Sequence, residues 1–543
     1  MNKQAYFFSI LIALFLALVP VANAEDAEAE MNLSPEVREL LNQLTDAGYN
    51  DSIPILEALE AKGGENMLPV FKTMLAGDLY YQKSDKLLMA VQNIDGKKRY
   101  SDVFTGENLG EISSGAISKI KVNNKLRGVL RQAISRIQLN ASKASTREQA
   151  IISLLSELDD SIIETLKARQ SVEEDGDVLE MMNVAFAMHH LQHGENTESR
   201  IEAINLLEQR LENEVRNLLT RIKSDEEDAR VKAAAVRALK TIEQRVENFQ
   251  FIDKLFFGLS LGSVLLLAAI GLAITFGVMG VINMAHGEMI MLGAYTTYVV
   301  QLLMPNSIDY SIWVAIPAAF LVSGAVGILI ERGVIRHLHG RPLETLLATF
   351  GISLILQQLV RTVFSPLNRQ VESPSWMSGS VDLNPVLSLT LNRLYILAFA
   401  LLVFGLLLMI LNKTNLGLHV RAVAQNRNMA KAMGIRTDRV DALTFGLGSG
   451  IAGMAGVALS QLTNVGPNLG QAYIIDSFMV VVFGGVGNLW GTLVAGFSLG
   501  IANKFIEPIT GAVLASILVL IFIILFIQKR PKGLFPQKGR AAE

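Results

Sequence analysis

Hydrophobic and polar positions divide this chain into two unlike halves. Charged residues are frequent between residues 25 and 250, whereas residues 255–528 consist mainly of long apolar runs. An α-helix needs about 20 apolar residues to cross the hydrocarbon core of a bilayer. Segments of this kind lie near 256–277, 284–304, 311–331, 344–364, 394–411, 442–464, 472–487, 488–505 and 511–528. The pattern predicts about nine transmembrane helices, with re-entrant pieces as the alternative for the shorter segments.

The loops between these segments predict their orientation. Loops 332–344 and 412–441 and the tail after residue 528 are rich in Lys and Arg, and such loops remain in the cytoplasm. If the chain starts outside at residue 250 and crosses the membrane at every segment, all three reach the cytoplasmic side. This agreement predicts that residues 25–250 lie outside the cytoplasm.

The first residues of the chain are typical of a secretory signal peptide. Residues 1–24 contain Lys3, then a short apolar region, and then the small-x-small sequence Ala-Asn-Ala. These features predict export and cleavage after Ala24, with an uncleaved anchor helix as the alternative. A signal peptide ahead of a multispan region indicates a bacterial inner membrane, with residues 25–250 in the periplasm.

The exported part has the periodicity of a helical domain. Three stretches begin with Arg147, Arg200 and Arg230, carry Ala at the fourth position, and then repeat apolar residues at helical spacing. Self-similar helices are typical of stacked α-solenoids, so we predict HEAT-like repeats, with a plain helical bundle as the alternative. Turn residues between the short apolar runs of residues 86–112 predict a small β element. The expected fold class is nonetheless all-α, with a membrane domain over residues 251–543.

Composition narrows the function. The chain is 50% hydrophobic and 18% charged, has no cysteine, and has no basic domain with interleaved aromatic residues. Disulfides and cysteine chemistry are therefore excluded, and nucleic acid is not an expected partner. The run Gly484-Gly485-Val486-Gly487 lacks the Lys-Ser/Thr pair of a phosphate-binding loop. We expect no catalytic residue, no cofactor, no metal site and no ATP hydrolysis by this chain.

Glycines are placed at regular intervals in one apolar segment. Gly446, Gly450, Gly453 and Gly456 follow one another at about one helical turn. Small residues at this spacing allow helix backbones to approach closely in a bilayer. The segment 442–464 is therefore expected to pack tightly against its neighbours.

Polar residues interrupt the apolar sequence "GVINMAHGEMIMLGAY" at residues 280–295. Asn283, His286 and Glu288 lie within six positions there, where each costs several kcal/mol unless it finds a partner or water. The apolar run is also longer than two crossings need, which predicts an interrupted helix near Gly277–Gly287. We predict that the three side chains line or gate a substrate path. The alternative is a tight turn at the cytoplasmic end, with His286 and Glu288 paired.

Several separate motifs resemble one known family. "GVINMAHGEMIMLGAY", "RAVAQNRNMAKAMGI", "FGGVGNLWGTLVAG" and the ending "RPKGLF" resemble the permeases of branched-chain amino-acid-type ABC importers, over roughly residues 255–535. Within this family, the amino-acid sequence of these motifs and the long exported domain are most similar to the first permease subunit of urea importers. The resemblance implies a second homologous permease, two cytoplasmic ATPase subunits and a periplasmic substrate-binding protein, with membrane lipid around the helices.

The resemblance also assigns a role to the basic loop 412–441. It implies that this loop docks into a cleft of an ATPase subunit, and Asn426 is placed to cap a short helix there. The residues expected to carry the docking are Arg421, Asn426, Arg427, Ala430, Lys431 and Gly434. The alternative is a basic loop that serves topology alone.

The expected function is ATP-driven import of urea. Branched-chain amino acids or short amides are alternative substrates of the same importer class. Two other classes remain open, namely a passive urea or amide channel and a receptor that senses through residues 25–250. The receptor hypothesis lacks a cytoplasmic output domain.

Overall fold

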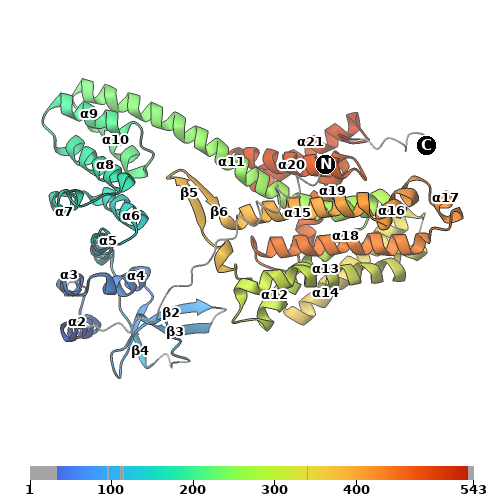
Figure 1. The fold of residues 1–543 in the computed structure, drawn as a ribbon, viewed down its shortest axis with the longest axis horizontal. Helices are drawn as coiled ribbons and strands as arrows, with labels where there is room; N and C mark the ends of the chain where they lie inside the picture. Colours follow the sequence, from blue (N-terminus) through green and yellow to red (C-terminus); the bar gives the residue numbers. More distant parts are fainter. Residues whose placement is uncertain are drawn as a thin grey trace. The chain divides into compact units, whose positions relative to one another are not determined.

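The computed structural model describes residues 34–535, except residues 50, 95, 96, 111, 113, 114 and 339. The predicted signal peptide lies outside these residues. The described chain divides into two compact units, within Ala24–Glu247 and Asn248–Glu543. Both are mostly helical (Figure 1), and each is described by itself.

The first unit begins with helices and a small antiparallel sheet. Strand β1 (Leu79–Gln82) pairs with both β2 (Leu88–Ile94) and β4 (Ile117–Lys119), and β3 (Lys97–Asp102) completes the order β3-β2-β1-β4. The predicted β element at residues 86–112 is thus confirmed as β2 and β3. The expected all-α fold class did not include the other two strands of this sheet, β1 and β4. The preceding helices are α2 (Pro35–Asp46), α3 (Ser52–Gly63), η1 (Gly64–Met67) and α4 (Leu68–Ala76).

The rest of the first unit is a row of antiparallel helices that repeats an ion pair. Arg147 pairs with Glu173 and Arg200 pairs with Glu226, each across 26 residues. Each glutamate also accepts a backbone N–H two residues further on, at 3.1 Å. This recurrence supports a repeat, although the HEAT type stays a prediction. The helices are α5 (Asn124–Gln138), α6 (Ala144–Leu154), η2 (Leu155–Glu157), α7 (Asp160–Gln170), α8 (Gly176–His193), α9 (Thr197–Leu207), α10 (Asn213–Asp225) and the start of α11 (Ala229–Met279).

The pair Arg147–Glu173 should make the stability of this unit depend on pH. Its hydrogen bonds to Arg147 lower the pKa of Glu173 from the ordinary 4.5 to about 2. Because the folded pKa is depressed, the stabilisation is present above about pH 4.5 and is lost as the pH falls toward 2. We expect Glu173→Gln to lower the free energy of unfolding by about 2–3 kcal/mol at neutral pH and to remove this acid dependence.

Circular dichroism of residues 24–247 during urea unfolding, at several pH values, measures the effect. The exposed pair Arg230–Glu198 supplies the control, because Glu198→Gln should cost less than about 1 kcal/mol. Equal losses for the two variants would contradict the prediction.

The second unit is a bundle of membrane-length helices. Among the described residues, seven helices are long and apolar enough to cross a bilayer: α11, α13 (Ile308–Gly333), α14 (Pro342–Phe364), α15 (Leu391–Lys413), α18 (Thr437–Ser460), α20 (Leu489–Thr510) and α21 (Ala512–Lys529). The two other predicted segments are the shorter or more polar helices α12 (His286–Leu303) and α19 (Leu469–Gly484). All nine predicted segments are thus helical. The remaining elements are η3 (Ile335–Leu338), η4 (Ser375–Met377), the hairpin β5 (Ser380–Asn384) and β6 (Leu387–Thr390), α16 (Asn415–Gln425) and α17 (Arg427–Ala432).

Glycines bring the central helices into backbone contact. A Cβ atom on Gly456 of α18 would lie 2.0 Å from the carbonyl oxygen of Ile290 in α12. One on Gly453 would lie 2.6 Å from the carbonyl oxygen of Ala319 in α13. The expected tight packing of the segment 442–464 is confirmed, since it is buried along most of its length between α12 and α13.

The same arrangement of helices occurs twice in the bundle. Helices α11 and α18 run antiparallel and touch at Gly271 and Gly448, and α12 and α19 touch at Gly287 and Gly470. Helix α13 packs on α18 much as α20 packs on α11, where Gly500 meets Gly262. A non-helical turn joins α11 to α12 at residues 280–285, and another joins α18 to α19 at residues 461–468. The contacts of α11, α12 and α13 thus recur in α18, α19 and α20, which indicates an internal repeat.

Candidate functional site

The polar cluster lies where one helix stops and the next begins. Helix α11 ends at Met279, the next six residues are not helical, and α12 starts at His286. Gly280 takes a left-handed φ of 65°, which glycine adopts without steric cost. The predicted interruption near Gly277–Gly287 is confirmed.

Asn283 and His286 are fixed by the backbone of the interruption and of α11. The Asn283 Oδ1 atom accepts a hydrogen bond from the Ala285 N–H at 3.0 Å. The His286 Nε2 atom lies 2.9 Å from the carbonyl oxygen of Ala268 in α11. A carbonyl can only accept, so Nε2 carries the hydrogen and Nδ1 is left as an acceptor.

Glu288 is held by a polar stripe on α14. Its Oε1 atom accepts hydrogen bonds from Ser353 Oγ at 2.9 Å and from Gln357 Nε2 at 2.7 Å. One turn before Ser353 on the same helix, Thr349 Oγ1 accepts a hydrogen bond from the Met284 N–H at 3.2 Å. These α14 residues are buried, while the opposite face of the helix exposes large apolar side chains.

Sequence reasoning missed this stripe, although a signal for it exists. Thr345, Thr349, Ser353 and Gln357 recur every four residues in an otherwise apolar segment. That spacing places them on one face of a helix. A polar face on a membrane helix indicates contact with other polar groups inside the bundle.

The structure does not bring the three predicted side chains together. His286 turns toward α11 and Glu288 toward α14, and the alternative pairing of His286 with Glu288 is not formed. Glu288 meets α14 near the middle of that 23-residue helix rather than at its end. Each of the three residues has one buried atom without a hydrogen-bond partner within the described chain, namely Asn283 Nδ2, His286 Nδ1 and Glu288 Oε2. Burying such atoms costs free energy, so each is available to a solute or to water.

The basic loop forms two short helices, one of which is capped as predicted. Asn426 Oδ1 accepts from the Met429 N–H at 2.9 Å, which confirms the cap of α17. Arg427 does not face outward, because its guanidinium forms an ion pair with Asp441 of α18. Ala430 is buried against Val423 and Val440. Arg427 and Ala430 thus fasten α17 to the bundle.

Of the residues predicted to carry docking, four are exposed, namely Arg421, Asn426, Lys431 and Gly434. Arg421 donates to the carbonyl of Leu411, and Lys431 is exposed. Met429 and Met433 are 61% and 77% exposed, and sequence reasoning did not single them out. Methionine side chains adapt readily to a partner surface, so these two widen the docking surface predicted from charge.

Gly434 gives a test of this loop. Its φ is 86° and its neighbourhood is open, so a substitution there meets backbone strain but no clash. We expect Gly434→Val to abolish uptake while membrane insertion stays intact, because a β-branched residue in the left-handed region costs about 1–3 kcal/mol. Gly434→Asn, which tolerates this conformation, should retain most uptake.

Uptake by cells, normalised to the protein in the membrane, measures both variants. Gly333→Val is the matched control, since Gly333 is also unobstructed but has no positive φ. Normal uptake by Gly434→Val would show that the loop tolerates the distortion.

Comparison with known proteins fits this geometry. The family described as "Branched-chain amino acid transport system / permease component" matches residues 254–527. The chain belongs to this permease family. Its members named below are permease proteins of transport systems rather than enzymes, and the membrane unit is a multi-pass permease.

Curated relatives match the permease over the same half of the chain. It is 32% identical over 296 residues to the high-affinity branched-chain amino acid transport system permease protein LivH of Salmonella typhimurium, which covers 52% of this chain and 95% of the relative. It is 30% identical over 299 residues to BraD of Pseudomonas aeruginosa, covering 53% of this chain and 96% of the relative. A ribose import permease protein of Bacillus subtilis matches over 110 residues at 31% identity, 19% of this chain and 34% of that relative.

These matches do not extend over the first half of the chain. A nearly complete relative accounts for only about half of this chain, so the unit before α11 is additional to them. No solved structure matches the chain.

Proposed function

We propose that this permease is the membrane subunit of an ATP-driven importer of urea. The observation that carries the importer class is the family match together with a capped, outward-facing basic loop. The proposed partners are a second homologous permease, two cytoplasmic ATPase subunits that bind and hydrolyse ATP, and a periplasmic substrate-binding protein.

The proposed membrane arrangement has nine crossings, with the first unit in the periplasm. Contacts at the two ends of the bundle support it. At the end with the basic loops, Arg336 pairs with Asp438 at 3.1 Å, and the Phe535 N–H donates to Gly484. At the other end, the Arg369 N–H donates to the carbonyl of Val465. Each contact joins two segments that are separated in sequence by two of the longer helices, as this arrangement requires.

The substrate path is proposed at the interruption between α11 and α12. In transporters with internal repeats, substrate sites lie near mid-membrane, where broken helices begin. Here the first turns of α12 and α19 meet at Gly287 and Gly470, and Glu288 joins the middle of α14. The unpartnered donor of Asn283 and acceptors of His286 and Glu288 match a solute that both donates and accepts hydrogen bonds, as urea does.

Branched-chain amino acids are the second candidate substrate. The relatives that name a branched-chain amino acid support them. The side chains of the polar stripe on α14 carry neutral hydroxyl or amide groups, which favours a neutral solute over a zwitterion. The single carboxylate, Glu288, is the group that an amino-acid ammonium would need.

Uptake of labelled urea and labelled leucine tests the substrate. Cells with the permease and matched deletion cells should differ in urea uptake, and the difference should vanish when ATP is depleted. A difference for leucine alone would assign the amino-acid substrate, and a difference that survives ATP depletion would assign a passive channel.

Variants of the polar cluster test the path. Asn283→Leu, His286→Leu and Gln357→Leu should each lower the uptake rate at least about ten-fold in complexes that still assemble with the ATPase subunits. The neighbouring Gln358 is exposed on the outer face of α14, so Gln358→Leu is the control and should transport normally. Full transport by all three variants would assign the cluster to folding alone.

A role for the first unit is part of the same proposal. We propose that residues 25–250 receive the substrate-binding protein, with stabilisation of the assembled complex as the alternative. Deleting them while keeping the signal and the first membrane span should then lower uptake at low substrate concentration. Unchanged uptake at low substrate would contradict a receiving role.

A further inference from the structure

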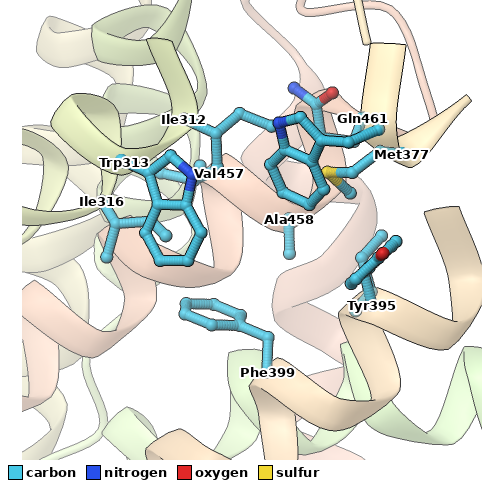
Figure 2. Close-up of a pocket in the computed structure, with 11 residues that line it drawn as sticks. Ile312, Trp313, Ile316, Met377, Tyr395, Phe399, Val457, Ala458 and Gln461 are labelled. Carbon is cyan, nitrogen blue, oxygen red and sulfur yellow. The ribbon is translucent and has the colours of Figure 1, made fainter. Parts of the chain in front are cut away.

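A cavity with no role in the proposed path lies at one end of the bundle. It has a volume of about 50 Å³ and is lined from α13, η4, α15 and α18. Figure 2 shows Trp313, Tyr395 and Phe399 arranged around the small side chain of Ala458. A cavity of this size is too small for a whole drug-sized ligand and admits only the end of a flexible chain.

The lining offers no partner for the two charges of an amino acid. It consists of large aliphatic and aromatic side chains and contains no Asp, Glu, Lys or Arg. The indole N–H of Trp376 already donates to the carbonyl of Asp309 at 2.9 Å. The amide of Gln461 is the one side-chain amide in the lining. A zwitterion would leave its two charges without partners there, at a cost of several kcal/mol.

The cavity lies at the depth of a membrane interface. Its residues come from the second and third turns of α13 and α15 and from the last turn of α18, so the cavity lies toward one end of all three helices. Trp313 stacks on Trp376 with ring centres 5.9 Å apart, and Trp376 meets Tyr395 edge to face at 5.0 Å. Tryptophan and tyrosine concentrate where hydrocarbon meets the headgroups.

The cavity is also continuous with the surface that faces lipid. Trp313 forms part of its wall and is 48% exposed. The adjoining outer face of α13 exposes Val314 and Leu321. In a multi-pass membrane protein, such an apolar face is covered by acyl chains.

We propose that this cavity binds an acyl chain of a membrane phospholipid, inserted between α13 and α15 with its headgroup at the interface. An uncharged, flexible hydrocarbon chain matches a lining that offers apolar contact and no charge. The bound chain fills space that would otherwise be left unpacked beside Ala458, and it therefore supports the packing of η4 against the bundle.

Tryptophan fluorescence offers a direct test, because the chain has three tryptophans. Trp313 and Trp376 border the cavity, whereas Trp490 lies in the first turn of α20 and does not line it. The double variant Trp313→Phe with Trp490→Phe leaves Trp376 as the single reporter. Phosphatidylcholine brominated in the middle of its acyl chains is added stepwise to the purified full-length chain in detergent micelles.

We expect saturable quenching of Trp376 at a few lipids per protein. Adding Ala458→Leu, or independently Ile316→Phe, fills the cavity and should lower this quenching by about half. The control keeps only Trp490, by Trp313→Phe with Trp376→Phe, and its quenching should not respond to Ala458→Leu. The thermal unfolding midpoint checks that each variant is folded. If one of the two filling variants fails to fold, the other still tests the proposal.

Two results would overturn the proposal. One is quenching of Trp376 that matches that of Trp490 and ignores both filling substitutions. The other is loss of the Trp376 quenching when the second permease is bound, which would make this face a subunit interface instead of a lipid site.

Discussion

Gly456→Val should abolish the folded permease, whereas the same change at Gly351 should leave it intact. A side chain on Gly456 would lie 2.0 Å from the carbonyl oxygen of Ile290 and 2.7 Å from the backbone nitrogen of Ala294. Both atoms belong to the backbone of α12, so no side chain can move aside. Helices α12 and α18 must separate, which we expect to cost more than about 4 kcal/mol.

Gly351 is the matched control for this experiment. It also lies in a membrane helix, α14, but no atom lies within 4 Å of the position of a Cβ atom there. Both changes carry the same helix-propensity cost for valine, so the difference isolates the helix contact. The amount of monodisperse protein after detergent extraction, and its thermal unfolding midpoint, measure it. Equal behaviour of the two variants would mean that α12 and α18 are not packed as described.

Asp441→Leu should uncouple the basic loop from the membrane bundle. Asp441 is buried in the first turn of α18 and pairs with Arg427, the first residue of α17. Breaking a buried ion pair by removing one partner costs about 3–5 kcal/mol, because the other charge is left unpaired. We expect uptake to fall at least about ten-fold while the ATPase subunits of the assembled complex still hydrolyse ATP.

An exposed pair nearby provides the comparison. Arg336 and Asp438 are both more than half exposed, so Asp438→Leu should cost at most about 1 kcal/mol and leave uptake nearly unchanged. Exchanging the buried charges, Arg427→Asp with Asp441→Arg, should restore part of the uptake. If the exchange restores nothing and Asp438→Leu is equally harmful, the ion pair does not carry the coupling.

Local sequence patterns predicted most of the helices and the break between two of them. Long apolar runs determined where the membrane helices lie, because a helix is the simplest way to satisfy the backbone in hydrocarbon. The glycines around Gly280 and the polar residues after it predicted the interruption. Asn426 predicted the cap of α17. These features depend on residues a few positions apart, and short-range spacing is directly visible in a sequence.

The partners of the polar residues could not be predicted in the same way. Asn283, His286 and Glu288 are close together in the sequence. In the structure, however, His286 forms a hydrogen bond with Ala268 of α11, and Glu288 forms one with Ser353 of α14. Which helix lies beside each residue depends on the packing of the whole bundle, because residues four positions apart on a helix share a face but successive residues do not.

The basic loop shows the same division. Its sequence predicted a charged segment on the cytoplasmic side with a short capped helix. Only the tertiary structure decided that Arg427 and Ala430 turn inward and that Met429 and Met433 turn outward. A single turn of helix has both an inner and an outer face, and the residues around it are similar in composition. The choice between the faces is made by Asp441 and Val440, which approach from another helix, and by the free energy of burying the arginine with its counter-charge.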